Sequence, residues 1–249
     1  MDNKIKIKRI SVSNLSNMIK KMSSMTTEAY LNIGSEHFTS SVYTPTRDVV
    51  KYISFPLNDV MEPDKPIEQE IKLSFFNASR VISALSHFDP HLLQAEIHTF
   101  MEDGICYASK INLKDKKLRI ELECQDMSFG FTSMTDDQLG RAFNEATKVT
   151  EFELTKEMMT DAMSLLKDES GEMMTIEIDE LGVHFKGQKF DLIVDDNIVS
   201  NEVISKTTFK TFLDKLDKEN YKVVVCEFKL LFYSNDTNTK MMLNTAVTD

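Results

Sequence analysis

The sequence predicts an α+β fold of two similar domains, each with two helices packed on antiparallel sheets. The main observation is a strand–helix–hairpin unit that occurs four times along the 249 residues, twice in each half. The second observation is a segment, 126–149, that interrupts the rhythm of the strands midway. We therefore expect a first domain over 1–125, an interdomain connector over 126–149 and a second domain over 150–249.

The clearest copy of the unit covers residues 150–189. Phe152 and Leu154 alternate with glutamates, which is the period-two pattern of a short strand. Thr155 stands at the N-cap position of a helix that has one apolar stripe, and two alternating runs then meet at Gly182, which predicts a hairpin. The apolar positions of this copy are Met158, Met159, Ala162, Met163 and Leu166 in the helix, and Met174, Ile176, Ile178, Val183 and Phe185 in the hairpin.

The other three copies share the order of elements and the turn residues of this unit, but few of its other residues. Gly34 and Gly104 mark the hairpin turn in the first two copies, and the last copy has no glycine there. Asp89-Pro90 ends the second helix, because proline cannot continue an α-helix. The remaining expected helices cover 12–25, 77–88 and 205–218. The expected strands and hairpins cover 4–10, 28–43, 48–55, 70–76, 94–124 and 221–234.

The connector is rich in polar residues and carries several large apolar side chains. Part of it, from Asp136 to Phe143, is expected to form a helical turn. Exposed aromatic residues on such a segment either cover an apolar edge or help to form a docking groove.

Charge is distributed unevenly between the elements. The whole chain has a net charge of −11, which alone argues against nucleic acid as a partner. The four expected helices, however, sum to +5 and the rest of the chain to −16. Lysine on exposed helix faces also has a simpler explanation, because it is a good helix former. The helix cations are Lys20, Lys21, Arg80, Lys156, Lys167, Lys206, Lys210, Lys215 and Lys218, against Glu157, Asp161, Asp214 and Asp217.

Several classes of protein are excluded by what the sequence lacks. It has no apolar run of about 18 residues, so no membrane span is expected, and its charged N-terminus does not resemble a signal peptide. The three cysteines have no CxxC spacing and are expected to be reduced thiols of a cytoplasmic protein. Glycine-rich phosphate loops are absent, and no cofactor is expected.

The candidate metal and catalytic residues do not form a site. His87 and His91 are four residues apart, but Pro90 breaks the helical face between them. Asp195 and Asp196 are more simply explained by a solvated turn. No arrangement of nucleophile, base and acid is evident, so neither a metal site nor an enzyme is expected.

Two halves of two units each, joined by a connector, resemble the DNA polymerase sliding clamp (processivity factor) family. The segment FELTKEMMTDAMSLLKDESGEMMTIEIDELGVHFKG is similar to the helix and hairpin that open a clamp's second domain. The segments NASRVISALSHF and QAEIHTFMEDGICYA are similar to the second helix and hairpin of its first domain. The resemblance spans nearly the whole chain, and size and composition are most similar to the clamps of tailed bacteriophages and to proliferating cell nuclear antigen.

The resemblance implies a DNA-clamp fold and a ring-shaped homotrimer, with helices lining the hole and edge strands pairing between subunits. Lysines on those helices would contact the phosphates of duplex DNA without reading sequence. The implied partners are a DNA polymerase and a clamp loader, in the cytoplasm of the host cell if the protein is viral. The implied DNA-facing residues are Lys20, Lys21, Arg80, Lys156, Lys167, Lys206, Lys210 and Lys215, with Glu157 and Asp161 opposing them on the third helix. The implied pocket for partner peptides contains Met127, Phe129, Phe131, Ala246 and Val247.

Two other functions remain open at this point. A clamp-like adaptor that forms no ring would share the repeats without gathering its lysines on one surface. A metal-dependent nuclease would use the acidic residues, with Asp195 or Asp196 essential for cleavage.

Overall fold

The computed structural model describes residues 3–125 and 134–245, and it confirms the expected α+β class. Within those ranges the chain forms two compact units. Unit 1 is drawn from Met1–Val42 and Tyr52–Met134, and unit 2 from Tyr43–Lys51 and Thr135–Asp249. The strand β4 (Val49–Pro56) crosses this division, so a short piece of the first half belongs to the second unit. No helix of the described residues is long and apolar enough to cross a membrane.

Unit 1 is built on an antiparallel sheet with one parallel contact, in the order β3-β2-β6-β8-β7-β1-β5. The strand β9 pairs with β8 on the same side as β6, further along β8. The strands are β1 (Asn3–Ile10), β2 (Ala29–Ile33), β3 (His37–Tyr43), β5 (Met61–Pro63), β6 (Ile71–Phe75), β7 (Gln94–Glu102), β8 (Ile105–Lys114) and β9 (Arg119–Glu123).

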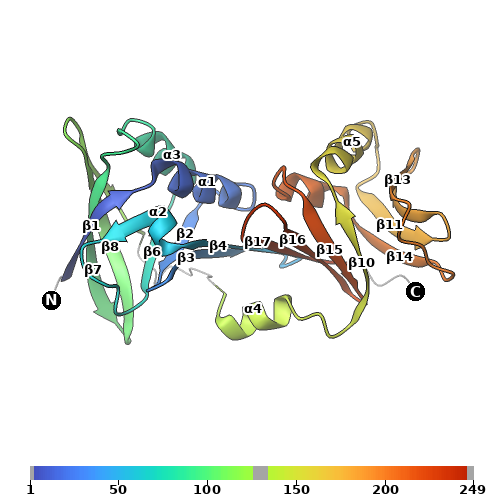
Figure 1. Ribbon diagram of the computed structural model, residues 1–249, viewed down its shortest axis with the longest axis horizontal. Coiled ribbons are helices and arrows are strands. Elements are labelled where there is room, and N and C mark those ends of the chain that lie inside the picture. Colours follow the sequence, from blue (N-terminus) through green and yellow to red (C-terminus); the bar gives the residue numbers. More distant parts are fainter. Residues whose placement is uncertain (1–2, 126–133, 246–249) are drawn as a thin grey trace. The chain divides into compact units, whose positions relative to one another are not determined.

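Three helices accompany this sheet: α1 (Val12–Ser23), α2 (Leu57–Val60) and α3 (Ala78–Leu85). The hydroxyl of Ser11 accepts a hydrogen bond from the N–H of Asn14, and Asn77 caps α3 in the same way. The apolar stripe of α1 is buried against the sheet, with Met18 and Ile19 inaccessible to solvent. In Figure 1, α1 and α3 lie next to each other on one side of the unit 1 strands.

Unit 2 contains two antiparallel sheets, in the orders β10-β15-β16-β17 and β13-β12-β11-β14. Phe152 of the first sheet packs edge-on against Phe185 of the second, with ring centroids 6.5 Å apart. The strands are β10 (Lys148–Leu154), β11 (Met173–Asp179), β12 (Gly182–Lys186), β13 (Asp191–Asp195), β14 (Ile204–Phe209), β15 (Tyr221–Cys226), β16 (Lys229–Ser234) and β17 (Thr239–Asn244). The helices are α4 (Asp136–Ala142), α5 (Lys156–Lys167) and the 3₁₀ helix η2 (Lys210–Lys215).

The clearest sequence unit is confirmed. The hydroxyl of Thr155 accepts a hydrogen bond from the N–H of Met158 at the start of α5, as its N-cap position predicts. Gly182 turns the following hairpin with a φ of 137°, which a residue with a Cβ rarely adopts. The helical turn expected between Asp136 and Phe143 is also present, as α4.

The helix expected over 205–218 is wrong. Residues 204–209 form the strand β14 instead, and only Lys210–Lys215 are helical, as a 3₁₀ helix. The reason is the run Thr207-Thr208-Phe209, since β-branched and aromatic residues favour strands. This run pairs with β11, where Thr175 lies opposite Thr207. Lys206 is therefore a strand residue.

Candidate nucleic-acid interface

Unit 1 presents two exposed cations from neighbouring helices. Because the apolar stripe of α1 is buried, its other face is turned to solvent, and Lys20 lies on that face. No acidic residue occurs in α1. Arg80 is exposed in the first turn of α3, where its own N–H is held by the side chain of Asn77 at 3.0 Å. These two helices can therefore present two positive side chains to an anion, and neither helix carries an acidic residue that would oppose them.

Among the predicted cations of unit 2, the exposed ones lie on α5. Lys156 begins the helix, and its N–H donates to the side chain of Asn220 at 3.0 Å. Lys167 lies in the last turn, where a cation is favoured by the helix dipole. Glu157 and Asp161 are exposed on the same helix, so its outer surface carries both signs of charge.

The other four predicted cations are engaged within the protein. Lys21 is only 4% exposed although it adjoins Lys20. Lys206 donates to the carbonyl oxygen of Glu227, and Lys215 is half-buried at the end of η2. Lys210 donates to the carbonyl oxygens of Leu166 (3.3 Å) and Glu169 (2.6 Å), so it caps the C-terminal end of α5. A DNA-facing role for all eight cations remains a prediction.

The five residues expected in the peptide pocket, Met127, Phe129, Phe131, Ala246 and Val247, lie outside the described residues. The turn between β15 and β16, however, meets the adjoining parts of both segments. The N–H of Glu227 donates to the carbonyl of Thr147 in the expected connector (3.1 Å), and the N–H of Thr245 donates to the carbonyl of Phe228 (3.0 Å).

Phe228 is a candidate docking residue that the sequence analysis missed. Its side chain is 53% exposed at this turn, although it sits in an apolar stretch that predicts a buried strand. The adjacent Lys229 donates to the carbonyl oxygens of Arg141 (3.1 Å) and Ala142 (2.8 Å), and this fixes the end of α4 to β16. Partial burial lowers the pKa of Lys229. The turn thus contacts α4, the end of the expected connector and Thr245 near the C-terminus.

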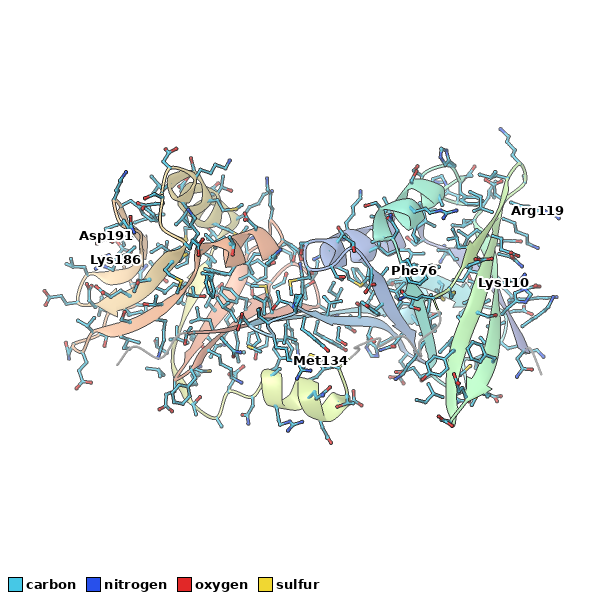
Figure 2. The ribbon with its side chains drawn as sticks, turned by 180° about the vertical axis from the view of Figure 1, so that it is seen from behind. Phe76, Lys110, Arg119, Met134, Lys186 and Asp191 are labelled. Carbon is cyan, nitrogen blue, oxygen red and sulfur yellow. The ribbon has the colours of Figure 1, made fainter. Side chains whose placement is uncertain are left out.

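In unit 1, β9 has no strand partner on its outer side among residues 3–125 and 134–245. Its Glu121 forms an ion pair with Lys110 on β8, at 2.8 Å. Beside β9 lies a groove of about 410 Å³ whose lining includes Phe76, Arg80 and Leu122. Phe76 is 65% exposed, and Figure 2 labels it together with Lys110 and Arg119. An open strand edge next to an exposed aromatic side chain is suited to pairing with another strand.

In unit 2, β13 is likewise paired on one side only within the part of the chain that the structure describes. It carries the exposed Ile193, and its first residue, Asp191, contacts two side chains of the neighbouring strand β12. Figure 2 labels Asp191 and Lys186 in this sheet.

The described residues hold no group of three or more histidine, cysteine, aspartate or glutamate side chains that could bind a metal ion. His87 and His91 are both exposed, and Asp195 accepts a hydrogen bond from the N–H of Asn197, as a turn residue does. Burial raises the pKa of Cys124 to about 12, so its thiol is not activated as a nucleophile.

The fold is that of the DNA sliding clamps, as comparison with solved structures shows. PCNA from Thermococcus kodakaraensis superimposes with a TM-score of 0.67 at 11% identity, over 97% of this chain and 100% of that chain. A. fulgidus PCNA, bound to the C-terminal region of FEN-1, gives 0.66 at 11% identity over 98% and 99%. The DNA polymerase III subunit beta from Pseudomonas aeruginosa gives 0.63 at 10% identity, over 100% of this chain and 65% of that chain.

The comparisons by sequence give no such match. No protein-family model matches this chain, and no curated protein matches it. Function therefore has to be argued from this chain's own residues on a clamp fold.

Proposed function

We propose that this protein is a sliding clamp that encircles duplex DNA and tethers the replicative DNA polymerase for processive synthesis. The observation that carries the proposal is the pair of exposed cations, Lys20 and Arg80, on neighbouring helices of a clamp fold that have no acidic residues. Cations in this position contact phosphates without reading bases, which gives attraction and still permits sliding. The net charge of −11 discourages DNA from binding to other surfaces. Such a protein is a scaffold rather than an enzyme.

The ring is proposed to be a homotrimer closed by strand pairing between subunits. The open edge of β9 in unit 1 would pair with the open edge of β13 in a second copy. The groove beside β9, with Phe76 at its rim, would then receive an apolar side chain such as Ile193 of that copy. Closing the ring in this way leaves neither edge exposed to unwanted pairing.

Partners are proposed to dock at the turn between β15 and β16. Residues 126–149 would act as the connector between a first domain over 1–125 and a second over 150–249. Met127, Phe129, Phe131, Ala246 and Val247 would line the pocket together with Phe228. The partners would be a DNA polymerase and a clamp loader, and A. fulgidus PCNA bound to the C-terminal region of FEN-1 is a precedent for tail recognition on this fold. A protein of the bacteriophage type would act in the cytoplasm of the host cell.

The test replaces Lys20 and Arg80 by glutamate and compares the double variant with Lys116→Glu/Lys117→Glu. The control changes the charge equally, in the exposed turn between β8 and β9. Affinity for a 30-base-pair duplex is measured against salt concentration, and the number of subunits by native mass spectrometry. The helix variant is expected to lower the magnitude of the salt slope by about 0.9 for each lost phosphate contact, and the control to leave it unchanged.

A trimer in all three proteins, with weakened DNA binding only in the helix variant, supports the proposal. A monomer at micromolar concentration, or equal binding by both variants, contradicts it. The second candidate is a clamp-like adaptor without DNA encirclement. It is favoured by the engagement of Lys21, Lys206 and Lys210 within the protein, and it predicts no difference between the two variants.

A further inference from the structure

Three exposed aliphatic side chains lie at one end of the sheet β13-β12-β11-β14, and the proposed function does not use them. Leu181 lies in the turn between β11 and β12, and Val199 and Val203 lie in the segment between β13 and β14. Each is between 59% and 66% exposed. A single exposed aliphatic residue needs no explanation, but three on two adjoining segments mark an interaction surface. We call these three residues the aliphatic patch.

Backbone contacts hold the two segments of the aliphatic patch against each other. The N–H of Ser200 donates to the carbonyl oxygen of Asp179 at 2.8 Å, which joins the β13–β14 segment to the end of β11. The residue that follows Val203 is paired with β11 in the sheet. The N–H of Leu181 donates to the carboxylate of Asp179 at 2.7 Å, which fixes the turn. The three side chains are therefore carried by segments that are bonded to the same strand end.

A buried side chain supports this strand end from the neighbouring strands. His184 of β12 is inaccessible to solvent, and its Nε2 lies 3.1 Å from a carboxylate oxygen of Asp179. Its Nδ1 lies 2.7 Å from a carboxylate oxygen of Asp191 on β13. The patch is thus displayed by a turn that is tied to three strands. A surface that is already ordered loses less conformational entropy when a partner binds.

The charge around the aliphatic patch is acidic. Glu180, Asp196 and Glu202 are exposed in the same two segments. No lysine or arginine occurs at 179–185 or at 190–205. The two lysines of this sheet are engaged elsewhere, since Lys186 forms ion pairs with acidic residues of β11 and β13, and Lys206 donates to a carbonyl oxygen of the β15–β16 turn. The acidic side chains of the two segments are therefore not neutralised by cations of their own sheet.

This combination selects the chemistry of the partner. Nucleic acids and anionic membranes are repelled by the acidic side chains. A basic protein segment is attracted by them, and such complementary charges steer and orient a partner at the rim of a contact. Aliphatic side chains of that segment would gain affinity by removing the patch from water.

We propose that the aliphatic patch binds a basic segment of a partner protein, in which lysine or arginine residues flank aliphatic side chains. The patch covers the aliphatic side chains, and Glu180, Asp196 and Glu202 contact the cations. The β15–β16 turn was proposed for other partners, so this surface would serve a second class of partner. The inference goes beyond the proposed ring and does not depend on it.

The experiment uses the full chain and three synthetic peptides of equal length as probes. One peptide alternates lysine with leucine, one lysine with serine, and one glutamate with leucine. Isothermal titration calorimetry measures affinity, and hydrogen exchange with mass spectrometry locates the site. The lysine–leucine peptide is expected to bind at least tenfold more tightly than the other two and to slow exchange at 180–183 and 197–203. Its affinity should fall with rising salt, because salt screens exposed charges.

A charge-reversal variant tests the acidic side chains. Glu180→Lys/Glu202→Lys is expected to weaken binding of the lysine–leucine peptide about tenfold, because attraction is replaced by repulsion. The matched control, Glu68→Lys/Glu70→Lys, makes the same change of charge at exposed positions of unit 1. The control should leave the affinity within about twofold of wild type, because these positions lie outside the patch.

A second variant tests the aliphatic side chains. Leu181→Ser/Val203→Ser is also expected to weaken binding about tenfold, because less apolar surface is removed from water. Its matched control is Leu92→Ser/Met101→Ser, which shortens two exposed apolar side chains of unit 1 and should bind like wild type. Thermal unfolding of every variant is compared with wild type, and if one patch variant is unfolded the other decides.

Equal weakening by a patch variant and its control overturns the inference, as does binding without slowed exchange at 180–183 and 197–203. Slowed exchange of these segments that increases with protein concentration, in the absence of peptide, means that a second copy of the chain covers the patch, and this also overturns it. A protein that forms no trimer refutes the proposed ring, while the peptide measurements still decide whether the patch binds a basic segment.

Discussion

Replacing Lys51 by methionine tests the buried ion pair of unit 2. The side chain of Lys51 is 1% exposed, and its ammonium lies 2.9 Å from a carboxylate oxygen of Asp217 and 3.0 Å from the carbonyl oxygen of Lys215. Methionine has a similar length and volume, so the main loss is the charge. Asp217 is itself only 16% exposed, and removing one partner of a buried pair typically costs about 3–5 kcal/mol. We expect the free energy of unfolding to fall by about that amount.

The measurement is urea unfolding followed by a probe in unit 2, such as hydrogen exchange of the β16 amides. At about 2–4 °C for each kcal/mol, the midpoint of thermal unfolding is expected to fall by roughly 10 °C. The double variant Lys51→Met/Asp217→Asn should recover part of the loss, because no unpaired carboxylate then remains. Lys218→Met, at an exposed neighbouring position, is the control and should change stability by less than about 0.5 kcal/mol. A loss below about 1 kcal/mol in Lys51→Met would refute this reasoning.

Three further predictions concern individual side chains. Lys229→Met removes the donor at the end of α4, so exchange of the α4 amides should rise about five- to tenfold while the β15 amides are unaffected, and equal exchange in both proteins would contradict the contact. Gly182→Ala should destabilise the protein by more than about 2 kcal/mol in urea unfolding, because the new Cβ would lie 2.3 Å from the carbonyl oxygen of Asp195. The control is Gly140→Ala, which lies in an open helical position and should be neutral or stabilising. Phe228→Ala should weaken capture of the polymerase in a pull-down at least tenfold, with thermal stability unchanged, because an exposed aromatic anchor contributes to binding and little to folding.

The sequence predicted correctly those helices and strands that are determined by neighbouring residues in the chain. The unit from Thr155 to Phe185 was read correctly because its cap, its helical stripe and its alternating strands each depend on near neighbours. The segment 205–218 was misread because its lysines and apolar residues also fit a helix. Its pairing with β11, about 30 residues away, decided the outcome, and such a partner is not visible in one sequence.

The candidate sites depended on tertiary contacts and were less predictable. Lys20 and Lys21 are adjacent and chemically identical, yet one is exposed and the other buried, because successive helix residues point in different directions. The contacts of His184 with Asp179 and Asp191 had no sequence signal, since these two acidic residues come from different strands. Phe228 could have been suspected only from its position at a strand turn.

The short stretch Tyr43–Lys51 has a consequence for any attempt to express the two halves separately. It belongs to unit 2 although the residues on either side of it belong to unit 1. A truncated product that ends at residue 125 would therefore retain Lys51 without its counter-ion, Asp217. The remaining fragment, from residue 126 onward, would keep Asp217 but lack the segment Tyr43–Lys51 that carries Lys51. Because the chain path interleaves the two units, we expect the two fragments to fold when they are expressed together and not when each is expressed alone.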